Sequence, residues 1–137
     1  MHLILDTGPW VALHCKGDKY HDWAKAQFSR HTGSFLTCEA VVAETCFLLA
    51  RAGFDPGKAL ALLERGVVDI GMSLGEQSAT VRGLFERYDN VPASLADACL
   101  VRMAELYDPC KILTLDSDFH IYRRHGNKAI EVVSPHL

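Results

Sequence analysis

Two aspartates follow short apolar runs of this sequence. Asp6 comes directly after the run His2–Leu5, and Asp116 comes directly after the run Lys111–Leu115. Short apolar runs bounded by turn residues predict buried strands. Ligand sites of open parallel sheets form outside the carboxyl ends of the strands, at the point where the strand order reverses. Both carboxylates are therefore candidates for one site at that edge.

Two further acids stand in apolar segments that predict helices. Glu44 is the only charged residue between Ala40 and Ala50, and Asp97 has apolar residues on both sides. A helix as apolar as the segment around Glu44 is expected to be buried nearly all round. A buried carboxylate must be paired or must bind a metal ion.

Each of these acids also has a purely structural interpretation. Asp6 and Asp116 could form turns or cap the helices that follow them. Asp97 could close a capping box with Ser94, and Glu44 could form a buried ion pair with an arginine. The four acids together are more specific than any one of them. If they converge, carboxylates at ~4 Å repel each other by several kcal/mol, and a divalent cation would stabilise them. Ligand sets made of oxygen alone favour Mg²⁺ or Mn²⁺ over zinc.

The elements that would position these acids alternate along the chain. Strands are predicted at residues 2–5, 34–37, 67–70, 111–115 and 129–133. Helices are predicted at residues 10–14, 19–31, 38–51, 56–65, 76–88, 95–106 and 117–124, with Pro92 just before the helix at 95. This alternation predicts an α/β sandwich with a mainly parallel sheet of about five strands. The length of 137 residues favours a single domain over residues 1–137.

Composition limits the class of protein. Hydrophobic residues make up 49% and charged residues 23% of the chain, which is typical of globular proteins. No apolar run reaches the ~18 residues of a membrane span, and the first residues lack the basic region of a signal peptide, so we expect a cytoplasmic protein. The net charge of −3 is not the balance of a general nucleic-acid-binding protein. Five cysteines without a C-x-x-C pair predict reduced thiols.

Five segments, in this order, carry a resemblance to a known family: Leu5–Pro9, Gly17–Ala24, Val41–Glu44, Leu95–Ala98 and Leu113–Phe119. The chain resembles the PIN domain family, and most closely the VapC-type ribonuclease toxins of toxin–antitoxin modules. The resemblance covers the whole chain. It implies a three-layer α/β/α sandwich, a homodimer, an RNA substrate and inhibition by a small antitoxin protein.

The resemblance also implies the site and its chemistry. It implies a metal-dependent endoribonuclease that uses Mg²⁺ or Mn²⁺. A bound metal lowers the pKa of water, and in-line attack of that water on phosphorus would leave a 5′-phosphate and a 3′-hydroxyl. Asp6, Asp97 and Asp116 would be direct metal ligands, Glu44 a direct or water-bridged ligand, and Asp118 an auxiliary ligand.

Other polar and aromatic residues have candidate roles around such a site. Thr7 and Thr114 could orient a carboxylate or a water by hydrogen bonding, or be ordinary turn and strand hydroxyls. A basic cluster could hold RNA phosphates, or be a solvated helix end; its candidate RNA-binding residues are Arg123, Arg124 and Lys128. Candidate dimer contacts are Trp10, Tyr20, Trp23 and the helix Pro56–Arg65.

Three other functions compete with the nuclease. A phosphoacceptor receiver domain needs an acceptor aspartate at the end of its third strand, but Asp69 lies inside the run 67–70. A haloacid-dehalogenase-like phosphatase needs a second aspartate two residues after Asp6, where Gly8 stands. A degenerate PIN domain that serves only as an interaction module is disfavoured because all four acids are present.

Overall fold

The central sheet has five parallel strands. A computed structural model describes residues 1–88 and 93–136, so Pro92 lies outside the described residues. The strands are β1 (His2–Leu5), β2 (Phe35–Thr37), β3 (Val68–Ile70), β4 (Cys110–Leu113) and β7 (Val132–Val133), in the order β3-β2-β1-β4-β7. Every neighbouring pair is parallel. The predicted five-stranded parallel sheet is therefore confirmed.

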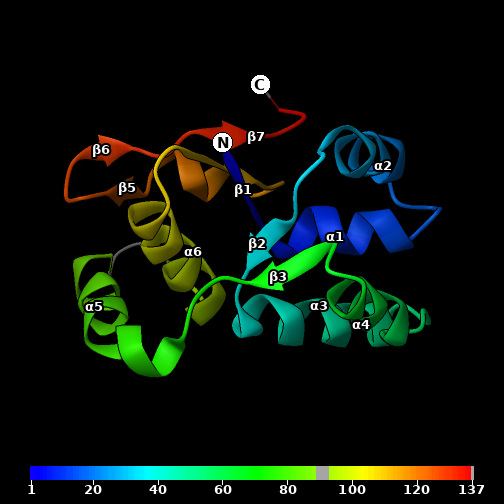
Figure 1. Ribbon diagram of the computed structural model, residues 1–137, viewed down its shortest axis with the longest axis horizontal. Helices are drawn as coiled ribbons and strands as arrows, with labels where there is room; N and C mark the ends of the chain where they lie inside the picture. Colours follow the sequence, from blue (N-terminus) through cyan, green and yellow to red (C-terminus); the bar gives the residue numbers. More distant parts are fainter. Residues whose placement is uncertain (89–92, 137) are drawn as a thin grey trace.

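Helices cover both faces of this sheet (Figure 1). The first group is α1 (Thr7–His14), α2 (His21–Arg30), α3 (Glu39–Arg51) and α4 (Gly57–Glu64); the second is α5 (Leu74–Arg87) and α6 (Leu95–Leu106). The chain moves from β1 to β2 to β3 in one direction and then crosses back to β4, so right-handed connections place the two groups on opposite faces. This is the predicted three-layer α/β/α sandwich, and its strand order reverses between β1 and β4.

The two central strands are apolar because both of their faces are covered. Ile4 and Leu5 of β1 and Ile112 and Leu113 of β4 are fully buried. Strands covered on both faces are expected to be continuous apolar runs rather than alternating ones. The apolar character that identified these runs in the sequence is therefore that of inner strands of the sheet. The acids that follow β1 and β4 lie at the ends of these inner strands.

The last part of the chain differs from the prediction. The segment 117–124 is not one helix: a short 3₁₀ turn, η1 (Ser117–His120), is followed by β5 (Arg123–Arg124), which pairs antiparallel with β6 (Lys128–Ala129). His125 and Gly126 have φ angles of 51° and 87°, and consecutive positive φ angles reverse the chain in a hairpin. The predicted strand 129–133 is accordingly divided between β6 and β7. In the part of the chain that the structure describes, no helix has the length and apolar character to cross a membrane.

Candidate functional site

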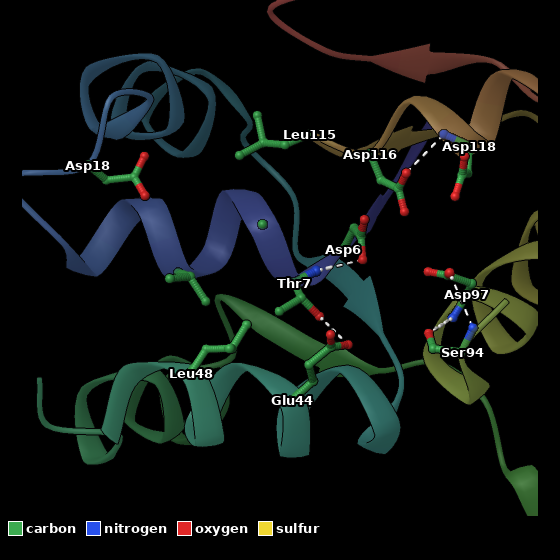
Figure 2. Close-up of a pocket in the computed structure, with 12 residues that line it drawn as sticks. Asp6, Thr7, Asp18, Glu44, Leu48, Ser94, Asp97, Leu115, Asp116 and Asp118 are labelled. Atoms are coloured by element: carbon green, nitrogen blue, oxygen red, sulfur yellow. Dashed lines mark hydrogen bonds between the residues drawn. The ribbon is translucent and has the colours of Figure 1, made fainter. Parts of the chain in front are cut away.

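A pocket of about 500 Å³ opens beside the carboxyl ends of β1 and β4 (Figure 2). This is the edge at which open parallel sheets form ligand sites. Six acidic residues line the pocket: Asp6, Asp18, Glu44, Asp97, Asp116 and Asp118. Among residues 1–88 and 93–136, none of those that line the pocket is basic. The structure thus brings together all five acids predicted from the sequence, and it adds Asp18, which the sequence did not single out.

Asp6 is the most deeply buried of these acids. It is 6% exposed and stands between β1 and α1, where it is the N-cap of α1: its Oδ1 accepts the Thr7 N–H at 2.7 Å. The helix therefore begins at Thr7 and not near Trp10 as predicted, because the cap satisfies the amide of the first helical residue. Asp6 therefore caps α1 and also lines the pocket, so the two interpretations of this residue are compatible.

Thr114 joins the ends of the two central strands. Its hydroxyl donates to Asp6 Oδ2 at 2.6 Å and accepts the Asp116 N–H at 2.9 Å. One buried side chain therefore fixes a carboxylate that follows β1 and the backbone of an acid that follows β4. Asp116 in turn caps η1, since its Oδ1 accepts the Asp118 N–H at 2.9 Å.

Glu44 enters the pocket from α3, where Thr7 Oγ1 donates to its Oε2 at 3.2 Å. The expectation that α3 is buried nearly all round is wrong, because Ala43, Glu44, Phe47 and Ala50 are exposed. The alternative of a buried ion pair is also wrong: within residues 1–88 and 93–136 Glu44 forms no ion pair. The apolar pattern of α3 reflects a face that the described residues leave uncovered.

Asp97 has the structural role considered above and also lines the pocket. The Ser94 side chain accepts the Asp97 N–H at 3.1 Å, and Asp97 Oδ2 accepts the Ser94 N–H at 3.4 Å, which completes a capping box. The hydroxyl of Tyr122, a buried residue that the sequence did not indicate, lies 3.5 Å from Asp97 Oδ2. Burial and the negative charges of Asp97, Asp118 and Asp116 raise the pKa of this hydroxyl, so it stays a neutral donor.

The pocket raises the pKa values of Asp6 and Asp97. Burial raises the pKa of Asp6 to about 7; the Thr114 and Thr7 hydrogen bonds oppose this rise, and the charges of Asp97 and Asp116 add to it. Burial also raises the pKa of Asp97, with further contributions from the charges of Asp116 and Glu44. Burial and the neighbouring negative charges therefore both make Asp6 and Asp97 harder to ionise.

The donor set fits a hard divalent cation. Carboxylate oxygens are the ligands that Mg²⁺ and Mn²⁺ prefer, and the described residues contribute no basic side chain to the pocket that would balance its six acids. In the described part of the chain, however, no three acidic, histidine or cysteine side chains already have the spacing of a metal site. Hydrogen bonds within the protein hold the carboxylates of Asp6, Glu44 and Asp97, and the remaining lone pairs of their oxygens are available to a cation.

The predicted RNA-binding cluster is not a single surface. Arg124 is 7% exposed, and its Nη1 donates to the carbonyl of Ala104 at 3.1 Å and to Asp108 Oδ1 at 3.3 Å. It lies beside Cys110, the first residue of β4, whereas Asp116 follows the other end of that strand. The prediction that Arg124 binds RNA phosphates is therefore wrong, because its guanidinium is buried and donates to groups of the protein itself.

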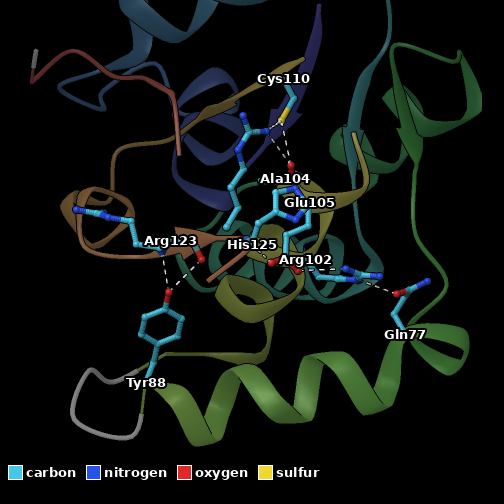
Figure 3. A network of polar contacts seen from close by, with 9 residues as sticks. Gln77, Tyr88, Arg102, Ala104, Glu105, Cys110, Arg123 and His125 are labelled. Carbon is cyan, nitrogen blue, oxygen red and sulfur yellow. Dashed lines mark hydrogen bonds and ion pairs between the residues drawn. The ribbon is translucent and has the colours of Figure 1, made fainter. Parts of the chain in front are cut away.

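The other two members of that cluster remain accessible. Arg123 Nη1 donates to the carbonyls of His120, Ile121 and Tyr122. Its backbone N–H donates to the Tyr88 hydroxyl, a contact visible in Figure 3. Lys128 is exposed. Trp10 needs a similar correction, because it is 0% exposed and cannot contribute to a dimer surface.

Replacing Arg124 by methionine should lower the stability of the protein without involving the pocket. The buried carbonyl of Ala104 loses its donor from this side chain, and we expect the free energy of unfolding to fall by about 2 kcal/mol. Lys128→Met, on the exposed neighbouring strand, should change it by less than about 0.5 kcal/mol. Urea unfolding of both variants measures the difference; equal stabilities would contradict the structural role of Arg124.

Comparisons with known proteins agree with this fold and pocket. The family model of the PIN domain matches residues 3–124, a range that contains all six pocket acids. Among curated proteins, no sequence matches the chain. Matching solved structures include the Mycobacterium tuberculosis protein VapC20, described as a Sarcin-Ricin loop cleaving toxin. That structure has a TM-score of 0.73 and 24% identity, over 85% of this chain and 91% of that chain. The likeness shows a shared fold.

Proposed function

This chain belongs to the PIN domain family, and from that premise we propose that it is a metal-dependent endoribonuclease. The observation that supports the proposal is the pocket at the reversal of strand order, lined by six acids and by no basic residue. RNA carries a negative charge at every phosphate, so it would be repelled from such a pocket unless a cation were bound there. A phosphodiester hydrolase that depends on a cation accounts for the acidic lining of the pocket and allows a negatively charged RNA to bind there.

Mg²⁺ or Mn²⁺ bound in the pocket would supply Lewis acidity, which lowers the pKa of water and offsets charge on the scissile phosphate. Asp6, Asp97 and Asp116 would hold the ion, Glu44 would bind it directly or through water, and Asp118 would assist. Within the chain, Thr114 fixes Asp6 relative to Asp116. Thr7 fixes one oxygen of Glu44 and leaves its other oxygen for a ligand or a proton.

The toxin role rests on the same premise. VapC20, which shares the fold, is described as a toxin that cleaves the Sarcin-Ricin loop. We propose that this chain is likewise the toxin of a toxin–antitoxin module, that it acts on single-stranded or structured RNA in the cytoplasm, and that a small antitoxin protein inhibits it.

The direct test is cleavage of a 5′-labelled RNA by the purified protein. We expect cleavage with Mg²⁺ or Mn²⁺, none with EDTA, and products that carry a 5′-phosphate and a 3′-hydroxyl. An Asp116→Asn protein purified in parallel controls for contaminating ribonucleases. Undiminished cleavage in EDTA, or products with a cyclic phosphate, would show that the reaction does not use a metal-activated water.

Thr114→Val should weaken this activity although Thr114 carries no charge. The variant keeps the side-chain shape but removes the donor to Asp6 and leaves the half-buried Asp116 N–H without its side-chain partner. Loss of a group that orients metal ligands typically lowers metal affinity or activity about 10- to 100-fold. Initial rates against Mg²⁺ concentration measure the effect. Thr114→Ser, which keeps the hydroxyl, is the matched control, and equal rates for the two variants would contradict the orienting role.

We further propose a homodimer, as the sequence predicted. Phe47 on α3 is 62% exposed, and Phe54 and Leu60 near it in the chain are also exposed. Exposed apolar groups of this kind are typical of surfaces that bind another protein. Light scattering is expected to give twice the mass of one chain, and Phe47→Asp is expected to reduce it to that of one chain. A wild-type monomer at micromolar concentration would contradict the dimer.

A further inference from the structure

The pocket has an apolar half beside its acidic half. Val11, Leu48 and Leu115 line it and are half-buried. In Figure 2, Leu48 and Leu115 lie on the side of the pocket away from Asp97. Metal binding and phosphate hydrolysis need none of these apolar side chains, so they require a different explanation.

Gly8 determines where Leu115 lies. A Cβ at Gly8 would stand 3.2 Å from each of three side-chain carbons of Leu115. Leu115 therefore packs directly against the backbone of α1, and it can do so because Gly8 has no side chain. The apolar half thus has a wall held in place by packing.

Asp18 is the polar group at the end of this apolar half (Figure 2). The loop between α1 and α2 carries it, and three hydrogen bonds fix it. Its N–H donates to the carbonyl of Cys15 at 2.9 Å, its carbonyl accepts the His21 N–H at 3.0 Å, and its Oδ1 accepts the Tyr20 N–H at 2.8 Å. An ionised carboxylate only accepts hydrogen bonds, so Asp18 presents a fixed acceptor to the pocket.

We propose that this half is a base-binding subsite that selects guanine in the nucleotide next to the scissile phosphate; the inference rests on the proposed ribonuclease function. Apolar walls suit the faces of a base. Guanine presents its N1–H and its 2-amino group side by side, and a carboxylate can accept from both. Uracil presents one N–H between two carbonyl oxygens, which a carboxylate repels.

The remaining features of the pocket agree with this occupant. The two halves of the pocket together have a volume of about 500 Å³, which lies in the range of small-molecule sites. Single-stranded RNA exposes the Watson–Crick edges of its bases, and proteins read these edges by hydrogen bonding while packing against the base faces. A base read by Asp18 cannot be paired, so the nucleotide at the cut must be single-stranded.

Binding of mononucleotides tests the subsite without requiring cleavage. Guanosine 5′-monophosphate and inosine 5′-monophosphate differ only in the 2-amino group, and we expect the first to bind about tenfold more tightly in Mg²⁺. Asp18→Asn should bring the two Kd values within about twofold of each other, because its amide can still accept the Tyr20 N–H but turns an NH₂ group toward the base. Titration calorimetry or NMR measures both constants.

Two further variants separate base reading from general effects. Asp22→Asn removes the same charge from an exposed position of α2 outside the pocket, so it should keep the tenfold preference. Leu48→Ala should weaken both nucleotides by a similar factor and leave their ratio unchanged. Equal binding of the two nucleotides to the wild type, or a preference that Asp18→Asn leaves intact, would overturn the subsite.

Cleavage mapping distinguishes failure of the subsite from failure of the nuclease. A random single-stranded RNA pool should be cut next to guanosine by the wild type, and Asp18→Asn should abolish that bias. Cleavage without base preference would overturn the subsite and leave the nuclease intact. An Asp18-dependent preference for the guanine nucleotide in a protein that cuts no RNA would support the subsite as a binding site and overturn the nuclease.

Discussion

Asp6→Asn is expected to stabilise the metal-free protein at pH 8 while it abolishes RNA cleavage. Burial raises the pKa of Asp6 to about 7, whereas an exposed aspartate in the unfolded chain has a pKa of about 4. Because the folded protein holds this proton more tightly, the free energy of unfolding falls as the pH rises from about 4 to about 7. Below that window the carboxyl is protonated in both states, and above it the full penalty is present.

The size of this penalty makes the test practicable. One pKa unit corresponds to about 1.4 kcal/mol, so ionising Asp6 in the folded state costs about 4 kcal/mol, a large part of the stability of an ordinary domain. The side-chain amide that replaces the carboxylate can still accept the Thr7 N–H, so the cap of α1 is kept. Urea unfolding in EDTA between pH 4 and pH 8 should show a smaller decline for the variant than for the wild type.

Cleavage should respond in the opposite direction. Removing a direct ligand should cost more than the 10- to 100-fold that is typical of groups that only orient ligands, so we expect at least a hundredfold loss in Mg²⁺. A variant that is more stable and yet inactive excludes misfolding as the cause. Parallel pH profiles for the two proteins would contradict the raised pKa, and retained cleavage would contradict Asp6 as a ligand.

The second large effect concerns Asp97, whose two roles can be separated. Mn²⁺ at a hundred times its Kd stabilises a protein that binds it only when folded by about 2.7 kcal/mol, roughly a 10 °C rise in Tm for a chain of this length. If Asp97→Asn weakens binding a hundredfold, the same Mn²⁺ concentration gives only about 0.4 kcal/mol. Without metal, the Tm of the variant should be equal to or above that of the wild type, because repulsion by Asp116 and Glu44 is relieved.

Ser94→Ala is the matched control for the capping box. It removes the side chain that accepts the Asp97 N–H but leaves the Asp97 carboxylate in place. A lost cap costs about 1 kcal/mol, and we expect that cost with and without Mn²⁺, with the metal-induced shift retained. Melting curves of the three proteins with and without Mn²⁺ decide the question. An equal shift in the wild type and in Asp97→Asn would rule out Asp97 as a ligand.

Capping and convergence have the same origin, which explains why Asp6, Asp97 and Asp116 each supported two interpretations of the sequence. Asp6 and Asp116 cap the elements that follow β1 and β4, and Asp97 belongs to the box that opens α6. In a parallel sheet, an element that directly follows a strand begins at the carboxyl edge of that sheet, as the elements after Asp6 and Asp116 do. The helix α6 instead leads into the start of β4, so its first residues lie away from that start. Acids that cap such helices are therefore gathered at the edge where the pocket lies.

Apart from Asp118, which only the family resemblance indicated, the sequence alone predicted the alternation of strands and helices, the parallel five-stranded sheet and the pocket acids Asp6, Glu44, Asp97 and Asp116. These are properties of single elements, since apolar runs and caps report how one segment is buried and where it begins. Only the tertiary structure determined the features that depend on contact between two distant segments of the chain. It brought Asp18 from the α1–α2 loop to the pocket, buried Trp10 and the guanidinium of Arg124, and left one face of α3 exposed. No local pattern contains this information, because whether a side chain is covered depends on which other element packs against it.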